Sequence, residues 1–222
     1  YMQDYKQALV YMDSALLLAP DDEFILQGKT IVLWYMGDAE KGLETADKAL
    51  HAPKQHTPQL SHGLKGNLYA LIGKWEEALQ EFDTAMAIDP NYLANLEKGQ
   101  VLTAIHRFDE AVVCLQKYLT RKPDNPTALI TLANAYVGLK RYKEAVETFE
   151  RSLKMGAIAT ANDYYNIGCA YSLLKNQQQA LLCLERTLQL GWTDFEWMDK
   201  DADWNNIRKT PEFKALMQKY RK

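Results

Sequence analysis

The sequence lacks any long uncharged apolar stretch. Its longest such run, from Ile31 to Gly37, is far shorter than the roughly 20 residues that a helix needs to cross a bilayer. The first residues also lack the basic segment followed by an apolar segment that marks a secretory signal. We therefore expect no insertion into a membrane.

The sequence has no excess of either charge. Its 222 residues include 26 Lys and Arg against 29 Asp and Glu, which gives a formal net charge of −3. A chain with this balance has no broad positive field that would attract a phosphate backbone. We therefore expect no nucleic-acid partner.

Cysteine is scarce, and the residues that usually bind metals are poorly spaced for a metal site. The three cysteines, none of them in a C-x-x-C motif, are Cys114, Cys169 and Cys183. Three histidines fall within 12 residues, but no two of them are four residues apart on a helix: His51, His56 and His62. An odd number of cysteines without a paired motif favours a reducing compartment. We expect no metal, no cofactor and a cytoplasmic location.

Catalytic motifs are missing as well. The chain contains no glycine-rich phosphate loop, no H-E-x-x-H and no G-x-S-x-G. We therefore expect no catalytic residues and no enzyme activity. The sequence opens at Tyr1 in the middle of a repeat, described next, so we expect a longer parent protein. This leaves open the alternative of a substrate-selecting or regulatory arm of a larger enzyme.

The sequence does contain an internal repeat. A polar residue, an aromatic residue, two further polar residues and an alanine recur, for example in residues 74–78 and 141–145. The small residues at the equivalent site, at intervals of 34, 36, 33, 34 and 35 residues, are Ala8, Gly42, Ala78, Ala111, Ala145 and Ala180. Apolar residues recur at helical spacing within each repeat, and a short turn divides it. Each repeat is therefore predicted to be a pair of antiparallel helices.

One repeat shows the fullest family-like motif. Its motif residues are Tyr164, Ile167, Gly168 and Tyr171, followed by Ala180 and Leu184. This pattern resembles the tetratricopeptide repeat (TPR) family, whose hairpin of about 34 residues reads W-x2-L-G-x2-Y and then A-x3-F. The resemblance implies an all-α fold, a right-handed α-solenoid of stacked antiparallel helix hairpins with a C-terminal capping helix.

The domain organisation follows from the same repeat. We expect a partial repeat, with only its second helix, in residues 1–20 and five TPR-like hairpins in residues 21–190. Residues 191–222 are expected to form a Trp-rich cap and a terminal helix. In that cap, Thr193 and Glu196 are predicted to form a capping box at the start of a short helix.

Small residues recur at one site on the first helix of each repeat. They are Thr30, Gly66, Gly99, Ala133 and Gly168. Such residues let helices approach closely, and large side chains such as Phe82 and Phe149 are expected to fill the remaining volume. The residues just before three of these sites are Lys29, Lys65 and Lys98. We expect their stems to pack between helices while the ammonium groups reach water, or alternatively a basic row that meets an acidic partner.

By resemblance, the first helices line a concave groove that binds a peptide. The family's wall positions give these candidates: Asn67, Gln100, Asn134, Thr103, Thr131, Asn162, Tyr165, Asn166, Phe24, Trp34, Tyr35 and Leu64. A primary amide can both donate to and accept from a peptide backbone. Three amides at about 1 kcal/mol each fall short of the roughly 8 kcal/mol of micromolar binding, so apolar pockets must contribute. The alternative is that these amides are solvated and bind nothing.

The groove is expected to carry little charge, since Glu97 is the one charged residue at the wall positions. Family members that hold the C-terminal carboxylate of heat-shock chaperones use a clamp of Lys, Asn and Arg. The Lys and Arg sites of that clamp correspond here to Gly63 or Leu96, Thr127 or Asn162, and Thr131 or Asn166. The resemblance therefore implies a protein–protein interaction scaffold that binds an extended or helical peptide segment and is not a carboxylate clamp. Self-association through the terminal helices, including residues 4–18, is a third alternative.

Overall fold

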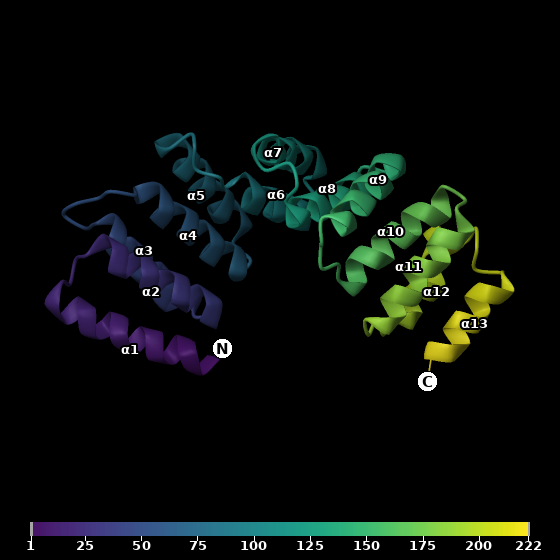
Figure 1. Ribbon diagram of the computed structural model, residues 1–222, viewed down its shortest axis with the longest axis horizontal. Helices are drawn as coiled ribbons and strands as arrows, with labels where there is room; N and C mark the ends of the chain where they lie inside the picture. The colour runs from purple at the N-terminus through teal and green to yellow at the C-terminus, as the bar shows by residue number, and fades with distance from the viewer. Residues whose placement is uncertain (1, 222) are drawn as a thin grey trace. The chain divides into compact units, whose positions relative to one another are not determined.

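The computed structural model describes residues 2–221 of the chain, and the side chains from Asp4 onward. These residues form thirteen α-helices, one 3-10 helix and no strand (Figure 1). The helices are α1 (Met2–Leu18), α2 (Glu23–Met36), α3 (Ala39–Leu50), α4 (Pro58–Leu71), α5 (Trp75–Ile88), α6 (Asn95–Ala104), α7 (Phe108–Arg121), α8 (Pro126–Gly138), α9 (Tyr142–Lys154), α10 (Ala161–Leu173), α11 (Gln177–Gln189), α12 (Phe195–Lys200), the 3-10 helix η1 (Ala202–Trp204) and α13 (Pro211–Tyr220). The predicted all-α fold is confirmed.

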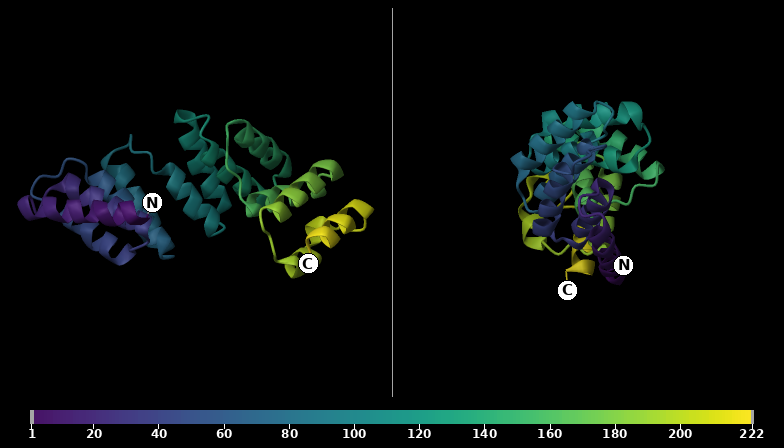
Figure 2. Two further views of the ribbon diagram at one scale, coloured as in Figure 1. Left: turned by 60° about the horizontal axis from the view of Figure 1, so that its bottom comes forward. Right: turned by 90° about the vertical axis from the view of Figure 1, so that its left-hand side faces the viewer.

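The chain divides into two compact units, the first ending at Val101 and the second beginning at Leu102. In the first unit, α2 packs on α3 and α4 on α5, and α3 also contacts α4. In the second, α8 packs on α9 and α10 on α11, and α13 lies against α11 (Figure 2). Each unit is thus a stack of helix pairs, as the repeat predicts.

The turns inside the helix pairs need one residue in the left-handed region. Gly37 and Gly73 take φ of 76° and 75°, a conformation that glycine adopts without a steric penalty. His106, Lys140 and Lys175 take the same conformation, with φ from 58° to 62°, although they carry side chains. The turn geometry is therefore shared along the chain, and glycine is not required for it.

Side chains cap the first turns of α8 and α10, whereas Thr57, which precedes α4, makes no such bond. The Asn125 side chain accepts a hydrogen bond from the Ala128 N–H at 2.9 Å at the start of α8. Thr160 and Asp163 form a reciprocal capping box at the start of α10. These bonds satisfy N–H groups that the first turn of a helix leaves without a partner.

The predicted capping box of Thr193 and Glu196 is wrong. Helix α12 begins at Phe195, so Asp194 occupies the capping position and accepts from the Trp197 N–H at 2.9 Å. Asp is as good a cap as Thr, and the residue adjacent to the first helical turn is the one that can reach its N–H groups.

The close helix contacts predicted from the small residues are confirmed. A methyl group added at Gly66 would lie 2.5 Å from the Phe82 ring, and one at Gly42 would lie 2.7 Å from Leu68. Phe82 and Phe149 are almost fully buried. The interior of the first unit is therefore packed too tightly for a larger residue at Gly66 or Gly42.

The three lysines at equivalent sites do not present free ammonium groups. Lys29 Nζ lies 2.6 Å from Asp13, and Lys65 Nζ lies 2.9 Å from Asp47 and 3.0 Å from Glu81. Lys98 likewise pairs with Asp83. The acidic partners recur with the repeat, at residues 13, 47 and 83, which is a signal that the sequence interpretation missed. The stems of these lysines are largely covered, as expected, and their ammonium groups are ion-paired, so the alternative of a free basic row is wrong.

Within residues 2–221, none of the helices combines the length and the apolar content that crossing a membrane would take.

Candidate peptide-binding surface

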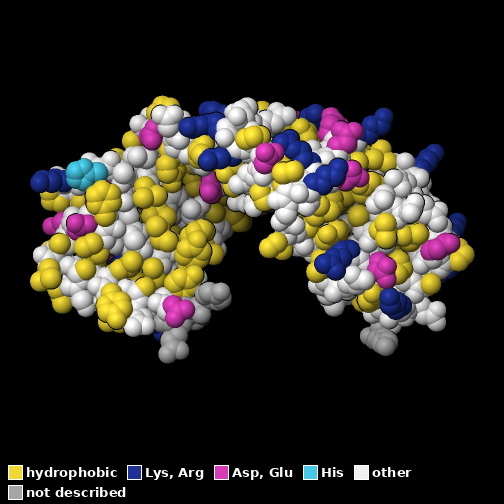
Figure 3. All heavy atoms as spheres, in the orientation of Figure 1, with side chains coloured by type: hydrophobic (Ala, Val, Ile, Leu, Met, Phe, Trp, Pro, Cys, Tyr) yellow, Lys and Arg dark blue, Asp and Glu magenta, His cyan; other side chains and the backbone are white. Residues whose placement is uncertain are grey.

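The aromatic candidates of the first unit lie on α2. Phe24 and Tyr35 each keep 58% of their surface exposed. Tyr35 stacks on Tyr5 with ring centroids 5.7 Å apart, and Trp34 lies 4.8 Å from Tyr35 at a tilt of 42°. In Figure 3 the part of the molecule formed by α1 to α4 shows many hydrophobic and few charged side chains. Helix α2 therefore presents apolar area that a partner could cover.

Leu64 on α4 behaves differently from these aromatic candidates. It is 6% exposed and belongs to the buried core of the first unit. A peptide could touch little of its surface. Its place in the wall stays a prediction, but its present role is packing.

Two of the predicted amides are unengaged. Asn67 on α4 is half-buried and Gln100 on α6 is exposed. Neither side chain makes a hydrogen bond to any residue that the structure describes, whereas Asn134 and Asn166 in the second unit are bonded to each other. Asn67 and Gln100 can therefore offer a donor and an acceptor each to a ligand at no cost in internal bonds.

A tyrosine and a glutamate lie beside these amides. The Tyr92 ring rests on α4 at Gly63, where an added methyl group would lie only 2.0 Å from the phenol oxygen. Burial, together with the nearby Glu97 carboxyl, raises the pKa of Tyr92 to about 12. Burial also raises the pKa of Glu97 above its ordinary value. Tyr92 therefore packs on α4 just before α6 begins and lies near the partly buried Glu97 carboxyl.

Polar groups between α2 and α4 are fully paired. The Glu23 carboxylate accepts from the His56 N–H at 2.5 Å and from the Thr57 N–H at 3.0 Å. Gln27 donates to the Ser61 hydroxyl at 3.0 Å and to Glu23 at 3.2 Å. This network fixes the junction of the first two hairpins and leaves no polar atom of Glu23 for a ligand.

In the second unit the predicted amides hold neighbouring helices together. Asn134 on α8 donates to Asp163 at 2.6 Å, and Asn166 on α10 donates to the Asn134 carbonyl oxygen at 3.2 Å. Thr131 is buried, and its hydroxyl donates to the Thr127 carbonyl at 2.9 Å. A peptide would have to break these bonds to use the same groups. Thr103 and the exposed Asn162 are the other predicted wall residues of this unit.

The C-terminal segment covers the last aromatic wall residue with an aromatic side chain of its own. Tyr165 on α10 is 5% exposed and stacks on Trp192, with centroids 4.5 Å apart and rings 4° from parallel. Its hydroxyl donates to Asp201 at 2.5 Å. Trp204 packs edge-on against Tyr165 and is fully buried. Tyr165 is therefore part of the cap interface, and little of its surface is left for a ligand.

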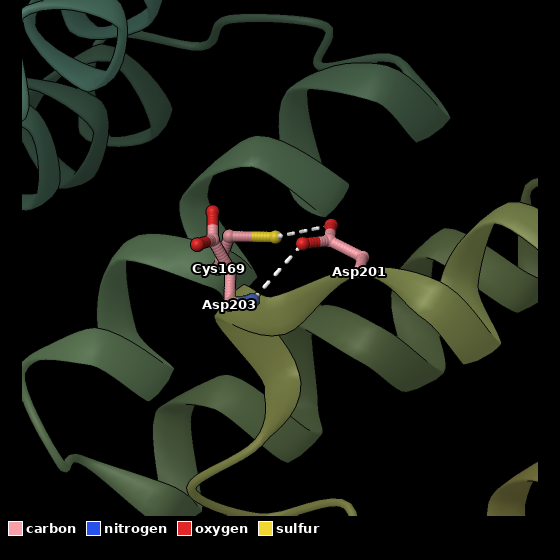
Figure 4. Close-up of side chains that lie close together, drawn as sticks. All are labelled: Cys169, Asp201 and Asp203. Atoms are coloured by element: carbon pink, nitrogen blue, oxygen red, sulfur yellow. Dashed lines mark hydrogen bonds between the residues drawn. The ribbon is translucent and has the colours of Figure 1, made fainter.

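The same segment brings together the one group of potential metal ligands found among the described residues. The Cys169 sulfur and one carboxylate oxygen each of Asp201 and Asp203 lie within 4.8 Å of one another (Figure 4). Asp201 accepts from Tyr165 and, at 3.7 Å, from the Cys169 thiol, and its other oxygen accepts from the Asp203 N–H at 3.0 Å. Burial raises the pKa of Cys169, so the thiol is held as a neutral donor. These hydrogen bonds account for the cluster as a polar anchor of the cap. Cys169 lies more than 30 residues before the two aspartates in the sequence, so no short sequence motif indicates this cluster.

The stacked helical hairpins define the protein as an α-solenoid of repeated helix pairs. Residues 102–157 and residues 164–190 match two family models that are each described as Tetratricopeptide repeat. The chain is a tetratricopeptide repeat protein. Proteins with this fold are, in general, scaffolds for protein–protein interaction, and they are typically not enzymes.

The curated relatives match part of the chain. A chloroplastic protein of Arabidopsis thaliana is 34% identical over 84 residues, which cover 36% of this chain and 24% of that protein. The Hsp70-Hsp90 organizing protein of Triticum aestivum is 30% identical over 107 residues, which cover 48% of this chain and 18% of that protein. The chain thus spans about a quarter or less of the length of these relatives.

A solved structure resembles most of the chain. The crystal structure of PilW, a type IV pilus biogenesis factor, matches with a TM-score of 0.73 at 23% sequence identity, covering 92% of this chain and 91% of that one. A likeness at this level of identity shows the shared fold.

Proposed function

We propose that the chain is a protein-binding scaffold and that its first unit binds an extended peptide segment of another protein along the first helices of its repeats. The observation that carries this proposal is the contrast between the amides of the two units. Asn67 and Gln100 have no internal hydrogen bond among the described residues, whereas Asn134 and Asn166 bond to each other. A free pair of amides on neighbouring first helices suits the N–H and C=O groups of an extended backbone.

The energetics require both amides and aromatic side chains. Two amide contacts contribute about 1 kcal/mol each, well below the roughly 8 kcal/mol of micromolar binding. Covering an exposed aromatic side chain contributes about 1.5–3 kcal/mol. Phe24 and Tyr35, each 58% exposed, supply such area on α2. The ligand we propose therefore has apolar side chains as well as an extended backbone.

The packing at Gly63 supports the proposal that this unit is not a carboxylate clamp. A clamp would need a long basic side chain near that position. The phenol oxygen of Tyr92 lies 2.0 Å from where the first side-chain atom would be. A lysine at position 63 would therefore displace the Tyr92 ring.

The proposal is tested with a display library of random twelve-residue peptides panned against the purified chain. We expect enriched peptides, and we expect the double variant Asn67→Ala/Gln100→Ala to weaken the best of them by about 10- to 30-fold, since two hydrogen bonds are lost. Glu77→Gln is the matched control, because Glu77 is exposed on the second helix α5. Panning without enrichment, or affinity unchanged in the double variant, would contradict peptide binding at these amides.

Self-association through α1 is a second candidate, and the exposure of that helix favours it. Its apolar side chains Val10, Tyr11, Leu17 and Leu18 keep 62%, 66%, 84% and 91% of their surface exposed. Residues spaced in this way share one side of a helix and could pair with a second copy. Sedimentation of the wild type and of Leu17→Lys decides the matter: equal monomeric mass for both would rule the candidate out.

The enzyme-arm alternative, the cytoplasmic location and the lack of a nucleic-acid partner stay predictions from the sequence.

A further inference from the structure

Glu97 on α6 has a buried carboxylate oxygen without a partner. Its Oε2 atom is inaccessible to solvent and accepts no hydrogen bond from any residue that the structure describes. None of the ion pairs among those residues includes it. A buried polar atom left in this state costs free energy that a ligand could recover by supplying a donor.

Glu23 shows how the same residue type is accommodated elsewhere in the first unit. It is 3% exposed, and its carboxylate accepts from two backbone N–H groups and from Gln27. The fold therefore can satisfy a buried carboxylate fully. The Oε2 atom of Glu97, at the one charged position of the predicted wall, is left without such a donor.

The basic residue nearest to Glu97 in the sequence is not its counter-ion. Lys98, next in the sequence, forms its ion pair with Asp83 on α5. The Tyr92 phenol also lies near the carboxyl and is neutral, since its pKa is raised to about 12. The carboxyl is thus an acidic group facing a neutral one in weakly hydrated surroundings.

Glu97 also lies within reach of the proposed ligand. Gln100 follows it by three residues on α6 and therefore lies on the same side of the helix. Tyr92, beside Glu97, touches α4 at Gly63, one helical turn before Asn67. A peptide backbone that contacts Asn67 and Gln100 would pass near Glu97, and a turn of the half-buried Glu97 side chain would bring its buried Oε2 atom to the ligand.

We infer that Glu97 receives a lysine or arginine side chain of the bound peptide, so that the scaffold selects extended segments with a basic residue among apolar ones. This inference rests on the proposed function. An ammonium or guanidinium group supplies the missing donor and the counter-charge together. The binding of a cation keeps the carboxylate ionised in the complex. The selectivity against an uncharged ligand arises because such a ligand leaves Glu97 unpaired.

The test compares peptides selected from the same twelve-residue library by the wild type, by Glu97→Gln and by the control Glu77→Gln. We expect a basic residue at one fixed position of the peptides selected by the wild type and by the control, and no such preference with Glu97→Gln. The best wild-type peptide is then made with norleucine in place of its basic residue. Norleucine should weaken binding to the wild type by about 10-fold or more and to Glu97→Gln by less than about 3-fold.

The outcomes separate this inference from the proposed function. Enriched peptides without a fixed basic residue would overturn the inference and leave peptide binding intact. A basic preference that persists in Glu97→Gln would also overturn it, since the cation would then bind elsewhere. A library that yields no enriched peptide would remove both proposals. The norleucine comparison on the wild type needs no variant, so it holds even if Glu97→Gln folds poorly.

Discussion

At the scale of single residues, two glutamates of the first unit show that surroundings decide what a side chain does. Glu23 is held by hydrogen bonds from a loop and from Gln27, so it stabilises the junction of α2 and α4. Glu97 is half-buried as a whole, but its Oε2 atom is buried and lacks such donors. The first carboxylate is therefore satisfied within the fold, and the second keeps one oxygen without a donor.

The state of Glu97 predicts a pH-dependent gain in stability for Glu97→Gln. Burial raises the folded pKa of Glu97 above its ordinary value of 4.5, so the unfolded chain loses this proton more readily than the folded one. The wild type is therefore destabilised as pH rises from 4.5 through the folded pKa, and no such loss occurs below 4.5. We expect the variant to be more stable than the wild type by about 1–3 kcal/mol at neutral pH and nearly equal to it in acid.

Urea unfolding at several pH values measures this difference. The control Glu77→Gln, on the exposed face of α5, should show no pH-dependent gain. A Glu97→Gln gain that is the same at all pH values would mean that the buried charge is not its cause.

At the scale of helices, stability depends on how closely neighbouring helices can approach. Gly66 on α4 faces the ring of Phe82 on α5, and Gly168 on α10 faces the ring of Trp204 in the cap. Each glycine leaves room for an aromatic side chain that is at most 1% exposed. The aromatic ring therefore occupies the volume that a side chain at the glycine would fill.

The space around each glycine predicts that substitution by alanine has opposite effects on stability at Gly66 and at Gly28. Gly66→Ala should destabilise the protein by about 1–3 kcal/mol, because the added methyl lies 2.5–2.9 Å from three atoms of the Phe82 ring. Gly28→Ala on α2 meets only the flexible end of Met12 at 3.1 Å, so the higher helix propensity of alanine, about 1 kcal/mol, should dominate. Thermal unfolding of both variants checks the signs, and equal shifts in melting temperature would contradict the packing argument.

At the scale of the whole molecule, the chain consists of two compact units whose helices contact mainly their neighbours in sequence. In such repeat arrays stability is close to a sum of nearest-neighbour terms, and distant repeats unfold with some independence. A single unfolding free energy therefore describes this protein less well than local values do.

Because stability is local, truncation of a core side chain should destabilise mainly the unit that contains it. Phe149→Ala, on α9 of the second unit, should cost about 3–5 kcal/mol by cavity formation, as should Phe82→Ala in the first unit. Amide hydrogen exchange should lose protection chiefly in the unit that carries the substitution. Equal loss in both units after either substitution would show that the chain unfolds as one cooperative body.

The sequence determined the repeat, the helix pairs and the buried aromatic residues, because a hairpin needs apolar residues at helical spacing and small residues at the contacts. These features depend on neighbours within about 40 residues, which the repeat makes visible.

Only the tertiary structure decided which predicted wall residues are free. Asn67 and Asn134 share one repeat position, yet Asn134 is bonded to Asp163 and Asn67 has no such bond to a described residue. Tyr165 is covered by Trp192 and Asp201, and the lysines at equivalent sites are paired with acidic residues of the preceding helix. The physical reason is that hydrogen bonds and burial are set by the particular residues that the next hairpin or the cap brings against each helix, and the repeat pattern does not encode them.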